Sequence, residues 1–196
     1  MSRLSMITAS AIALALTAFN ASAAKLSVDM VPGGDVDQNL VITDNPTFSV
    51  DILISDISDL AGFEFNLDFD GGLISADSIT SGNLFGADTW PITSQINANS
   101  ISFSETTFAA GLDITSPAIL ATINFKAIGP GSSNLTLSSV VLSDSLAASI
   151  ASFDTQNGNV YLAPVPLPPT FLLFATGCAW ITGKSRLRTK STPIQS

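Results

Sequence analysis

Strict alternation of apolar and polar side chains marks the segment 63–70 as a β-strand. Four apolar residues alternate there with four polar ones: Phe63, Glu64, Phe65, Asn66, Leu67, Asp68, Phe69 and Asp70. Because successive side chains of a strand point to opposite faces, this period of two predicts one buried face and one solvated face. A helix would scatter the phenylalanines around its axis. The segment 48–54 shows a similar alternation with a largely polar second face.

Further apolar segments and the turn signals between them extend this pattern over most of the chain. The segments 101–103, 119–125, 135–142 and 160–162 read as short strands. Turn signals separate them: Pro32-Gly33-Gly34, Asp44-Asn45-Pro46, Asp70-Gly71-Gly72, Gly129-Pro130-Gly131 and Gln156-Asn157-Gly158. Short strands with such punctuation favour an all-β fold, an antiparallel β-sandwich. One short helix is predicted at Ser143–Ser149, capped by Ser143 or Asp144.

The first 23 residues have the pattern of a signal peptide. Arg3 precedes an uncharged apolar run over 6–19, and the segment ends in the small-x-small pattern Ala21-Ser22-Ala23. We therefore expect cleavage before Ala24, which leaves an exported domain over residues 24–163. An uncleaved anchor is the alternative interpretation, but the run is short against the roughly 20 residues of a membrane span.

Composition changes abruptly after Ala163. Four prolines over 164–169 predict a stiff extended segment. The uncharged apolar segment 171–183 follows, then a basic cluster: Lys184, Arg186, Arg188 and Lys190. This order predicts a single transmembrane helix whose basic end stays in the cytoplasm, with the acidic domain outside. The span is short, which favours a transient anchor; a permanent single-pass anchor is the alternative.

The proline motif makes the tail resemble a known sorting signal. Residues 164–190, with the motif Val165, Pro166, Leu167 and Pro168, are similar to the PEP-CTERM domain; residues 191–196 form the remaining tail. In that family an exosortase recognises Val-Pro-Glu-Pro, an apolar span and basic residues. Leu167 replaces the glutamate, as in a known variant, and leaves the cognate exosortase open. The resemblance implies export to the envelope, outer surface or extracellular matrix of an exopolysaccharide-producing Gram-negative bacterium.

Charge and residue types exclude several function classes for the domain. Residues 24–163 hold all sixteen acidic residues against Lys25 and Lys126, a formal charge of −14. Such a surface repels nucleic acid. The sequence has no histidine, which excludes Ser-His-Asp and Cys-His catalysis and His-ligated zinc, and its one cysteine, Cys178, lies outside the domain. Nothing marks the carboxylate pair of a glycosidase. We expect no enzyme and no cofactor, calcium aside.

The domain itself also resembles a family. Residues 58–70, the segment 121–127 with Gly131, and the segments 135–144 and 157–160 are similar to strands of cohesin modules. The resemblance implies a jelly roll of about nine strands and protein–protein recognition, because cohesin modules bind dockerins. No dockerin calcium loop occurs in this sequence, so the dockerin-like partner would be another protein. Exopolysaccharide binding and a calcium-stabilised structural adhesin are the alternatives.

Three residues are candidates for ligand contact. Trp90 precedes Pro91 in a loop-like stretch and would stack on a sugar ring if exposed; a place in the core, where most phenylalanines are expected, is the alternative. Asp68 and Asp70 lead into the Gly71-Gly72 turn and offer carboxylates to calcium, which takes six to eight oxygens. Two carboxylates do not complete such a site, and a solvated strand end is the alternative.

Overall fold

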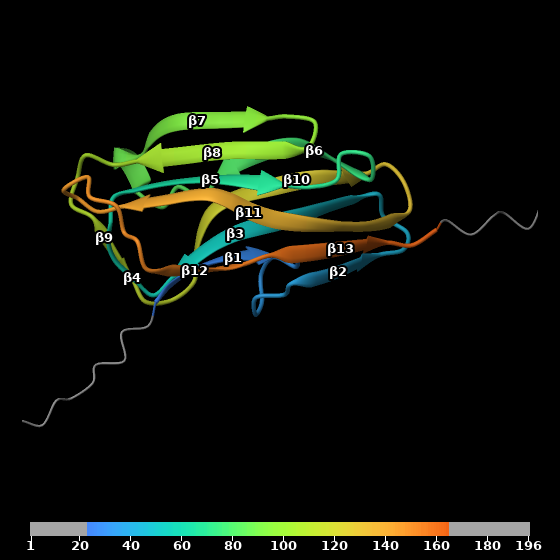
Figure 1. Ribbon diagram of the computed structural model, residues 1–196, viewed down its shortest axis with the longest axis horizontal. Helices are drawn as coiled ribbons and strands as arrows, with labels where there is room; N and C mark the ends of the chain where they lie inside the picture. Colours follow the sequence, from blue (N-terminus) through green and yellow to red (C-terminus); the bar gives the residue numbers. More distant parts are fainter. Residues whose placement is uncertain (1–22, 165–196) are drawn as a thin grey trace, which may run out of the picture.

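The computed structural model describes residues 23–164, which form a two-layer β-sandwich (Figure 1). One sheet has five strands in the order β12-β1-β3-β10-β6, and the other has six in the order β2-β13-β11-β5-β8-β7. Strands β4 and β9 make a separate pair. Pairing is antiparallel except for β1 with β12 and β13 with β2. The fold is therefore the predicted all-β sandwich of mainly antiparallel strands.

The structure contains more strands than the nine or so predicted, and the additional ones are short. Residues 23–164 contain thirteen strands and one 3₁₀ turn: β1 Ala24–Asp29, β2 Asn39–Ile42, β3 Thr47–Ser55, β4 Ile57–Leu60, β5 Gly62–Asp68, β6 Ile74–Ser81, η1 Gly86–Asp88, β7 Trp90–Ile96, β8 Ser100–Thr106, β9 Leu112–Ile114, β10 Ala118–Ala127, β11 Gly131–Ser143, β12 Phe153–Gln156 and β13 Gly158–Leu162. Nine of these have five residues or more. The other four lie at sheet edges or in the β4–β9 pair.

The clearest alternation in the sequence becomes β5, as predicted. Phe63, Phe65 and Leu67 are buried between the sheets, while Glu64 and Asp68 are exposed. The second face of β3 differs from its prediction, because Asp51 is buried there rather than solvated. Its Oδ1 accepts a 2.6 Å hydrogen bond from the hydroxyl of Thr122 on the neighbouring strand β10. A cross-strand partner thus allows a carboxylate inside a central strand.

Aromatic side chains fill the space between the two sheets. Seven phenylalanines are buried, as the sequence predicted for most of them: Phe48, Phe63, Phe65, Phe69, Phe85, Phe103 and Phe125. Phe125 stacks on Phe48 at 5.4 Å and meets the edge of Phe69 at 5.3 Å. Phe65 lies 5.9 Å from Phe103 on the adjacent strand. Each such ring buries about 150–250 Å², so these contacts dominate the core.

The helix predicted at Ser143–Ser149 is wrong. The chain reverses direction there instead, and Ser143 pairs with Ser149 across an isolated bridge. Asp144 organises the turn, because its Oδ1 accepts hydrogen bonds from the backbone N–H groups of Leu146 and Ala148 at 2.9 and 2.8 Å. Ala147 has a φ of 59°, which a right-handed helix does not contain. The aspartate therefore caps a tight turn, a role that its side chain fills as readily as a helix cap.

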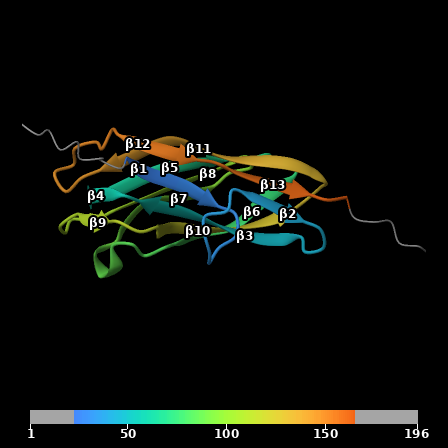
Figure 2. The same cartoon turned by 90° about the horizontal axis from the view of Figure 1, so that it is seen from below.

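The two ends of the described chain leave the sandwich at opposite ends of its long axis (Figures 1 and 2). Strand β11, thirteen residues long, connects them: Gly131 pairs with Leu162 near the C-terminal exit, and Ser143 pairs with Gly62 at the other end. At about 3.3 Å per residue, β11 spans about 40 Å. Within residues 23–164, the structure contains no helix with the length and apolarity to cross a membrane.

Candidate functional site

The outward side of β11, β5, β8 and β7 forms one open surface, called here the four-strand face. The strand register lines up residues across it, with Val141 opposite Glu64, Glu64 opposite Ser104, and Ser104 opposite Thr93. Residues at alternate positions of each strand share this side. No strand or helix of the described residues packs over it in Figure 1, where β7 is the free edge of the sheet.

Large apolar side chains gather at one end of the four-strand face. Trp90 is 60% exposed, Ile92 63% and Val141 49%. Beyond them Phe108, 85% exposed, meets Trp90 edge to face with 6.1 Å between ring centroids. Scattered single exposed apolar residues are ordinary, but a contiguous group of this kind is typical of an interaction surface.

A polar group without a partner lies on the floor of this apolar end. Ile92, Glu64, Ser104 and Val141 line a shallow hollow. Ser104 is only 2% exposed, and its hydroxyl has no hydrogen-bond partner in the part of the chain that the structure describes. Buried hydroxyls in folded proteins almost always have a partner. The Ser104 hydroxyl lies beneath the surface of this hollow and is itself inaccessible to solvent.

The charged residues of the four-strand face are acidic. Glu64 and Asp68 lie on it, and Asp68 Oδ2 accepts a 2.6 Å hydrogen bond from the hydroxyl of Ser138. The two lysines of the described residues, Lys25 and Lys126, lie on β1 and β10 of the other sheet. The face thus combines an apolar end with negative charge, which suits an apolar and basic partner surface.

A buried carboxylate lies beneath this face. Glu105 on β8 points toward the core opposite Phe63 and is 2% exposed. Burial raises the pKa of this carboxyl above its ordinary value of 4.5, and a hydrogen bond with Ser81 opposes the rise in part. Its Oε2 has no hydrogen-bond partner among residues 23–164. The sequence did contain a sign of this burial, because Glu105 follows Ile101 and Phe103 at alternate positions of one strand.

The predicted ligand residues have different outcomes. Trp90 is exposed, as ligand contact requires, but it begins strand β7 rather than lying in a loop. Asp68 ends β5 and binds Ser138, while Asp70 Oδ1 accepts a 2.9 Å hydrogen bond from the backbone N–H of Gly72. No group of three or more His, Cys, Asp or Glu residues that would hold a metal occurs within residues 23–164. Asp68 and Asp70 each accept a hydrogen bond within the fold.

Most residues of the predicted targeting segments lie outside the described part of the chain. These are Ala21 of the cleavage motif, the sorting motif Val165, Pro166, Leu167 and Pro168, and the basic residues Lys184, Arg186, Arg188 and Lys190. Ala24, the residue expected to follow the cleavage site, begins β1 and is 5% exposed. It pairs with Phe153 of β12, so Ala24 is part of the five-stranded sheet.

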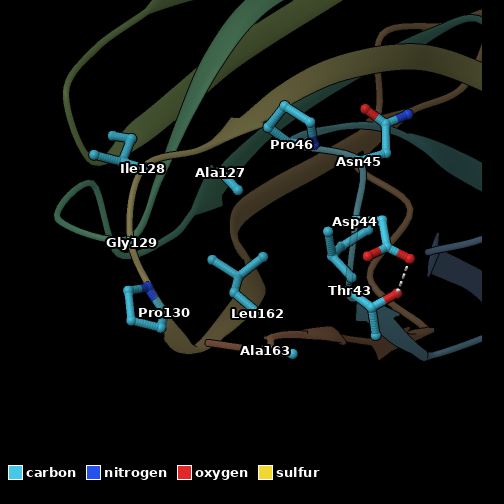
Figure 3. Close-up of a pocket in the computed structure, with 11 residues that line it drawn as sticks. Thr43, Asp44, Asn45, Pro46, Ala127, Ile128, Gly129, Pro130, Leu162 and Ala163 are labelled. Carbon is cyan, nitrogen blue, oxygen red and sulfur yellow. Dashed lines mark hydrogen bonds between the residues drawn. The ribbon is translucent and has the colours of Figure 1, made fainter. Parts of the chain in front are cut away.

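A second hollow lies at the C-terminal end of the sandwich (Figure 3). Pro46, Ile128, Pro130 and Leu162 contribute to its largely apolar wall. Its volume of about 180 Å³ is below the roughly 300–1,000 Å³ of most small-molecule sites. The hydroxyl of Thr43 there donates a 3.2 Å hydrogen bond to Asp44, so these polar groups satisfy each other. We therefore do not assign this hollow a ligand.

Sequence reasoning missed Ile92, Val141 and Phe108. Register shifts in the ladders, between Pro91 and Thr93 and between Ser138 and Val141, break the simple alternation on β7 and β11. Such β-bulges redirect side chains, and apolar residues next to them read as core in a pattern of period two. Pro91 favoured the loop assignment of this stretch, but proline is also compatible with an edge strand such as β7.

Comparisons with known proteins agree on the fold. The Cohesin domain family matches residues 35–160. A non-cellulosomal cohesin from the hyperthermophilic archaeon Archaeoglobus fulgidus is 14% identical with a TM-score of 0.58, covering 72% of this chain and 92% of that one. The sixth cohesin of Acetivibrio cellulolyticus scaffoldin B, solved with a Cel5 dockerin mutant, is 16% identical with a TM-score of 0.55, covering 72% and 99%.

A third structure, CaCohA2 from Clostridium acetobutylicum, is 19% identical with a TM-score of 0.54 and covers 72% of this chain and 91% of that one. Comparison with curated protein sequences gives no match. At these identities the solved structures establish the sandwich fold, and the family match extends over most of the described domain. The chain therefore belongs to the cohesin domain family.

Proposed function

We propose that the domain is a non-catalytic module for protein–protein recognition and that its four-strand face binds a dockerin-type module of another protein. The observation that carries this proposal is the group of exposed apolar side chains Trp90, Ile92 and Val141 on an open sheet face. Tryptophan is among the residues that most often dominate binding energy at interfaces.

The relatives support the type of partner. Several of the solved cohesins were determined as complexes with dockerins, including those from Acetivibrio cellulolyticus. The acidic face and the formal charge of −14 over residues 24–163 favour a partner surface with basic residues around an apolar centre. We expect such an association to weaken with salt, since opposite exposed charges are screened.

The test is capture of envelope proteins on the immobilised full chain, comparing a Trp90→Ala, Ile92→Ser double variant with Ile128→Ser. Ile128 is 57% exposed in the loop between β10 and β11, so its replacement matches the Ile92→Ser part of the change at a different place. Loss of hot-spot contacts of about 2 kcal/mol or more predicts at least about 30-fold weaker capture by the double variant. A dockerin-type partner requires calcium, so EDTA should also release it. Equal, saturable capture by both variants would contradict the proposal.

We also infer that the protein is exported by its N-terminal signal, sorted by an exosortase through the C-terminal tail, and held at the envelope or outside the cell. The sequence patterns at the two ends support this inference. The described chain ends on the side of the sandwich away from Trp90, about 40 Å along β11 (Figure 1). A tail attached to the envelope would thus present the apolar end outward. The intact mass of surface-extracted protein should lack residues 1–23 and the segment after the proline motif; a full-length mass would contradict processing.

A further inference from the structure

The other half of the six-stranded sheet carries a second surface, called here the amide face. It is the outward side of β2, β13 and the first half of β11. The register places Asn39, Asn159 and Asn134 in one row across three strands, and Val41, Tyr161 and Ser132 in the next. Gln38, Thr136 and Asn157 complete an open hollow of about 320 Å³ around the row of asparagines.

Hydrogen bonds hold the centre of this surface in place. Asn159 Nδ2 donates to Asn134 Oδ1 at 2.7 Å and to the Ser132 hydroxyl at 3.0 Å. Asn157 Oδ1 accepts a 3.0 Å hydrogen bond from the backbone N–H of Leu137. Side chains fixed in this way lose little conformational entropy when a ligand binds. The central amides are therefore preorganised by the sheet.

The periphery of the same row keeps unused hydrogen-bonding capacity. Within residues 23–164, the side-chain amides of Gln38 and Asn39 and the hydroxyl of Thr136 make no intramolecular hydrogen bond, and neither do the Nδ2 groups of Asn134 and Asn157. Each amide both donates and accepts. A sugar hydroxyl does the same, so a row of amides and hydroxyls matches a row of sugar hydroxyls without any charge.

The amide face is uncharged in a strongly acidic domain. None of the sixteen acidic residues lies at an outward position of β2 or β13, or on β11 between 132 and 136. Asp68, which pairs with Thr136 on the neighbouring strand β5, lies at the border of this surface. Tyr161, 47% exposed, stands beside the amides on β13 and presents a flat apolar ring. Aromatic rings of this kind combine a large apolar area with a polar tip. Acidic polymers would be repelled by the charge of −14 around this surface.

We propose that the amide face binds a neutral polysaccharide. One pyranose ring stacks on Tyr161, and the next sugar along the chain presents its hydroxyls to Asn39 and Asn134. Asn159 and Tyr161 are two residues apart on one strand, about 7 Å, so a sugar ring over Tyr161 leaves its neighbour within reach of the amides. Trp90 lies on the other half of the sheet, so the domain holds a polysaccharide and a protein partner at the same time. The proposal stands independently of the four-strand face.

The experiment is affinity electrophoresis of the full chain, kept in solution with a polyoxyethylene detergent that contains no sugar. Native gels carry hydroxyethyl cellulose, dextran, galactomannan or, as the anionic comparison, alginate. We expect at least one neutral polysaccharide to retard the native chain. The affinity derived from this retardation should be at least tenfold lower for Tyr161→Ala and for the double variant Asn39→Ala, Asn134→Ala. Ile128→Ser and Trp90→Ala should behave like the native chain. Equal thermal midpoints show that the variants are folded, since all the replaced side chains are on the surface.

Any of the following outcomes would overturn the proposal. Unchanged mobility in all three neutral gels would reject binding of neutral polysaccharides. Retardation by alginate alone would reject the neutral class. Retardation that persists in Tyr161→Ala and in the asparagine variant would reject the site, and loss in Trp90→Ala instead would assign the sugar to the four-strand face.

Discussion

Replacing Glu105 by glutamine should stabilise the domain at neutral pH. The carboxylate faces the core of the sandwich, is 2% exposed, and has one oxygen without a partner among residues 23–164. Burial of an ionised group without full pairing costs free energy, about 1–3 kcal/mol for one unsatisfied buried group. Glutamine keeps the shape and removes the charge, but its amide still lacks part of its partners. We therefore expect a gain of about 1 kcal/mol, or about 3 °C in the thermal midpoint for a domain of this size.

The raised pKa of Glu105 also determines how the stability difference between the two proteins depends on pH. Since burial raises the pKa of Glu105 in the folded state above 4.5, the unfolded chain releases its proton first as pH rises. Above about pH 4.5 the free energy of unfolding of the native protein should therefore fall relative to that of Glu105→Gln. The fall should continue until the carboxyl of the folded protein also ionises. At higher pH the difference between the two proteins should stay constant. Below about pH 4 the carboxyl is protonated in both states, and the two proteins should have equal stability.

Urea unfolding of both proteins between pH 3 and 8, followed by tryptophan fluorescence, measures this difference. Glu64→Gln is the matched control, because Glu64 is exposed on the opposite side of the same sheet, next to β8. It should leave the free energy of unfolding within about 0.5 kcal/mol of the native value at every pH. A Glu105→Gln protein that is less stable at pH 7, or whose difference from the native protein does not vary with pH, would refute the reasoning.

Three further predictions follow from the structure. Phe65→Ala should lower the free energy of unfolding by about 3–5 kcal/mol in urea titrations, because Phe65 is fully buried beside Phe103; a loss below 1 kcal/mol would contradict this packing. Ala147→Gly should raise the thermal midpoint, since Ala147 has a φ of 59° and glycine relieves about 1 kcal/mol of strain there; a lowered midpoint would argue against the turn. The midpoint should be the same in calcium and in EDTA, because Asp68 is hydrogen-bonded to Ser138 of the neighbouring strand β11 and Asp70 to Gly72 of its own turn. A rise of several degrees in calcium would show a site that these contacts do not reveal.

The strands of the core could be predicted because alternate residues of each strand are buried, which leaves a period-two pattern in the sequence. Phe63, Phe65 and Leu67 alternate with polar residues, and the sheet buries the apolar side of that alternation. Short edge strands such as β2 and β12 carry no such signal, since they have four residues each and pair in parallel with strands far away in sequence. The Ser143–Ser149 prediction failed because one aspartate caps a tight turn as well as a helix.

The surfaces were harder to predict than the core. Trp90 was identified because tryptophan is rare in this domain, but Val141 reaches the same face only through a register shift in β11. The amide face joins residues from 38 to 161, which become neighbours through the pairing of β13 with β2 and β11. No local pattern in the sequence indicates these pairings. Burial of Glu105 is different, because its position in phase with Ile101 and Phe103 on β8 indicates the buried side.

The central claim, that the four-strand face binds a protein partner, is tested most directly by site-specific photocrosslinking. A benzophenone amino acid replaces Ile92 in one full-length protein and Ile128 in another, both exposed but in different parts of the fold. After irradiation with envelope extract, we expect the probe at position 92 to give a discrete crosslinked product that EDTA abolishes, and the probe at position 128 to give none. Identical products from both positions, or none from position 92, would contradict the account.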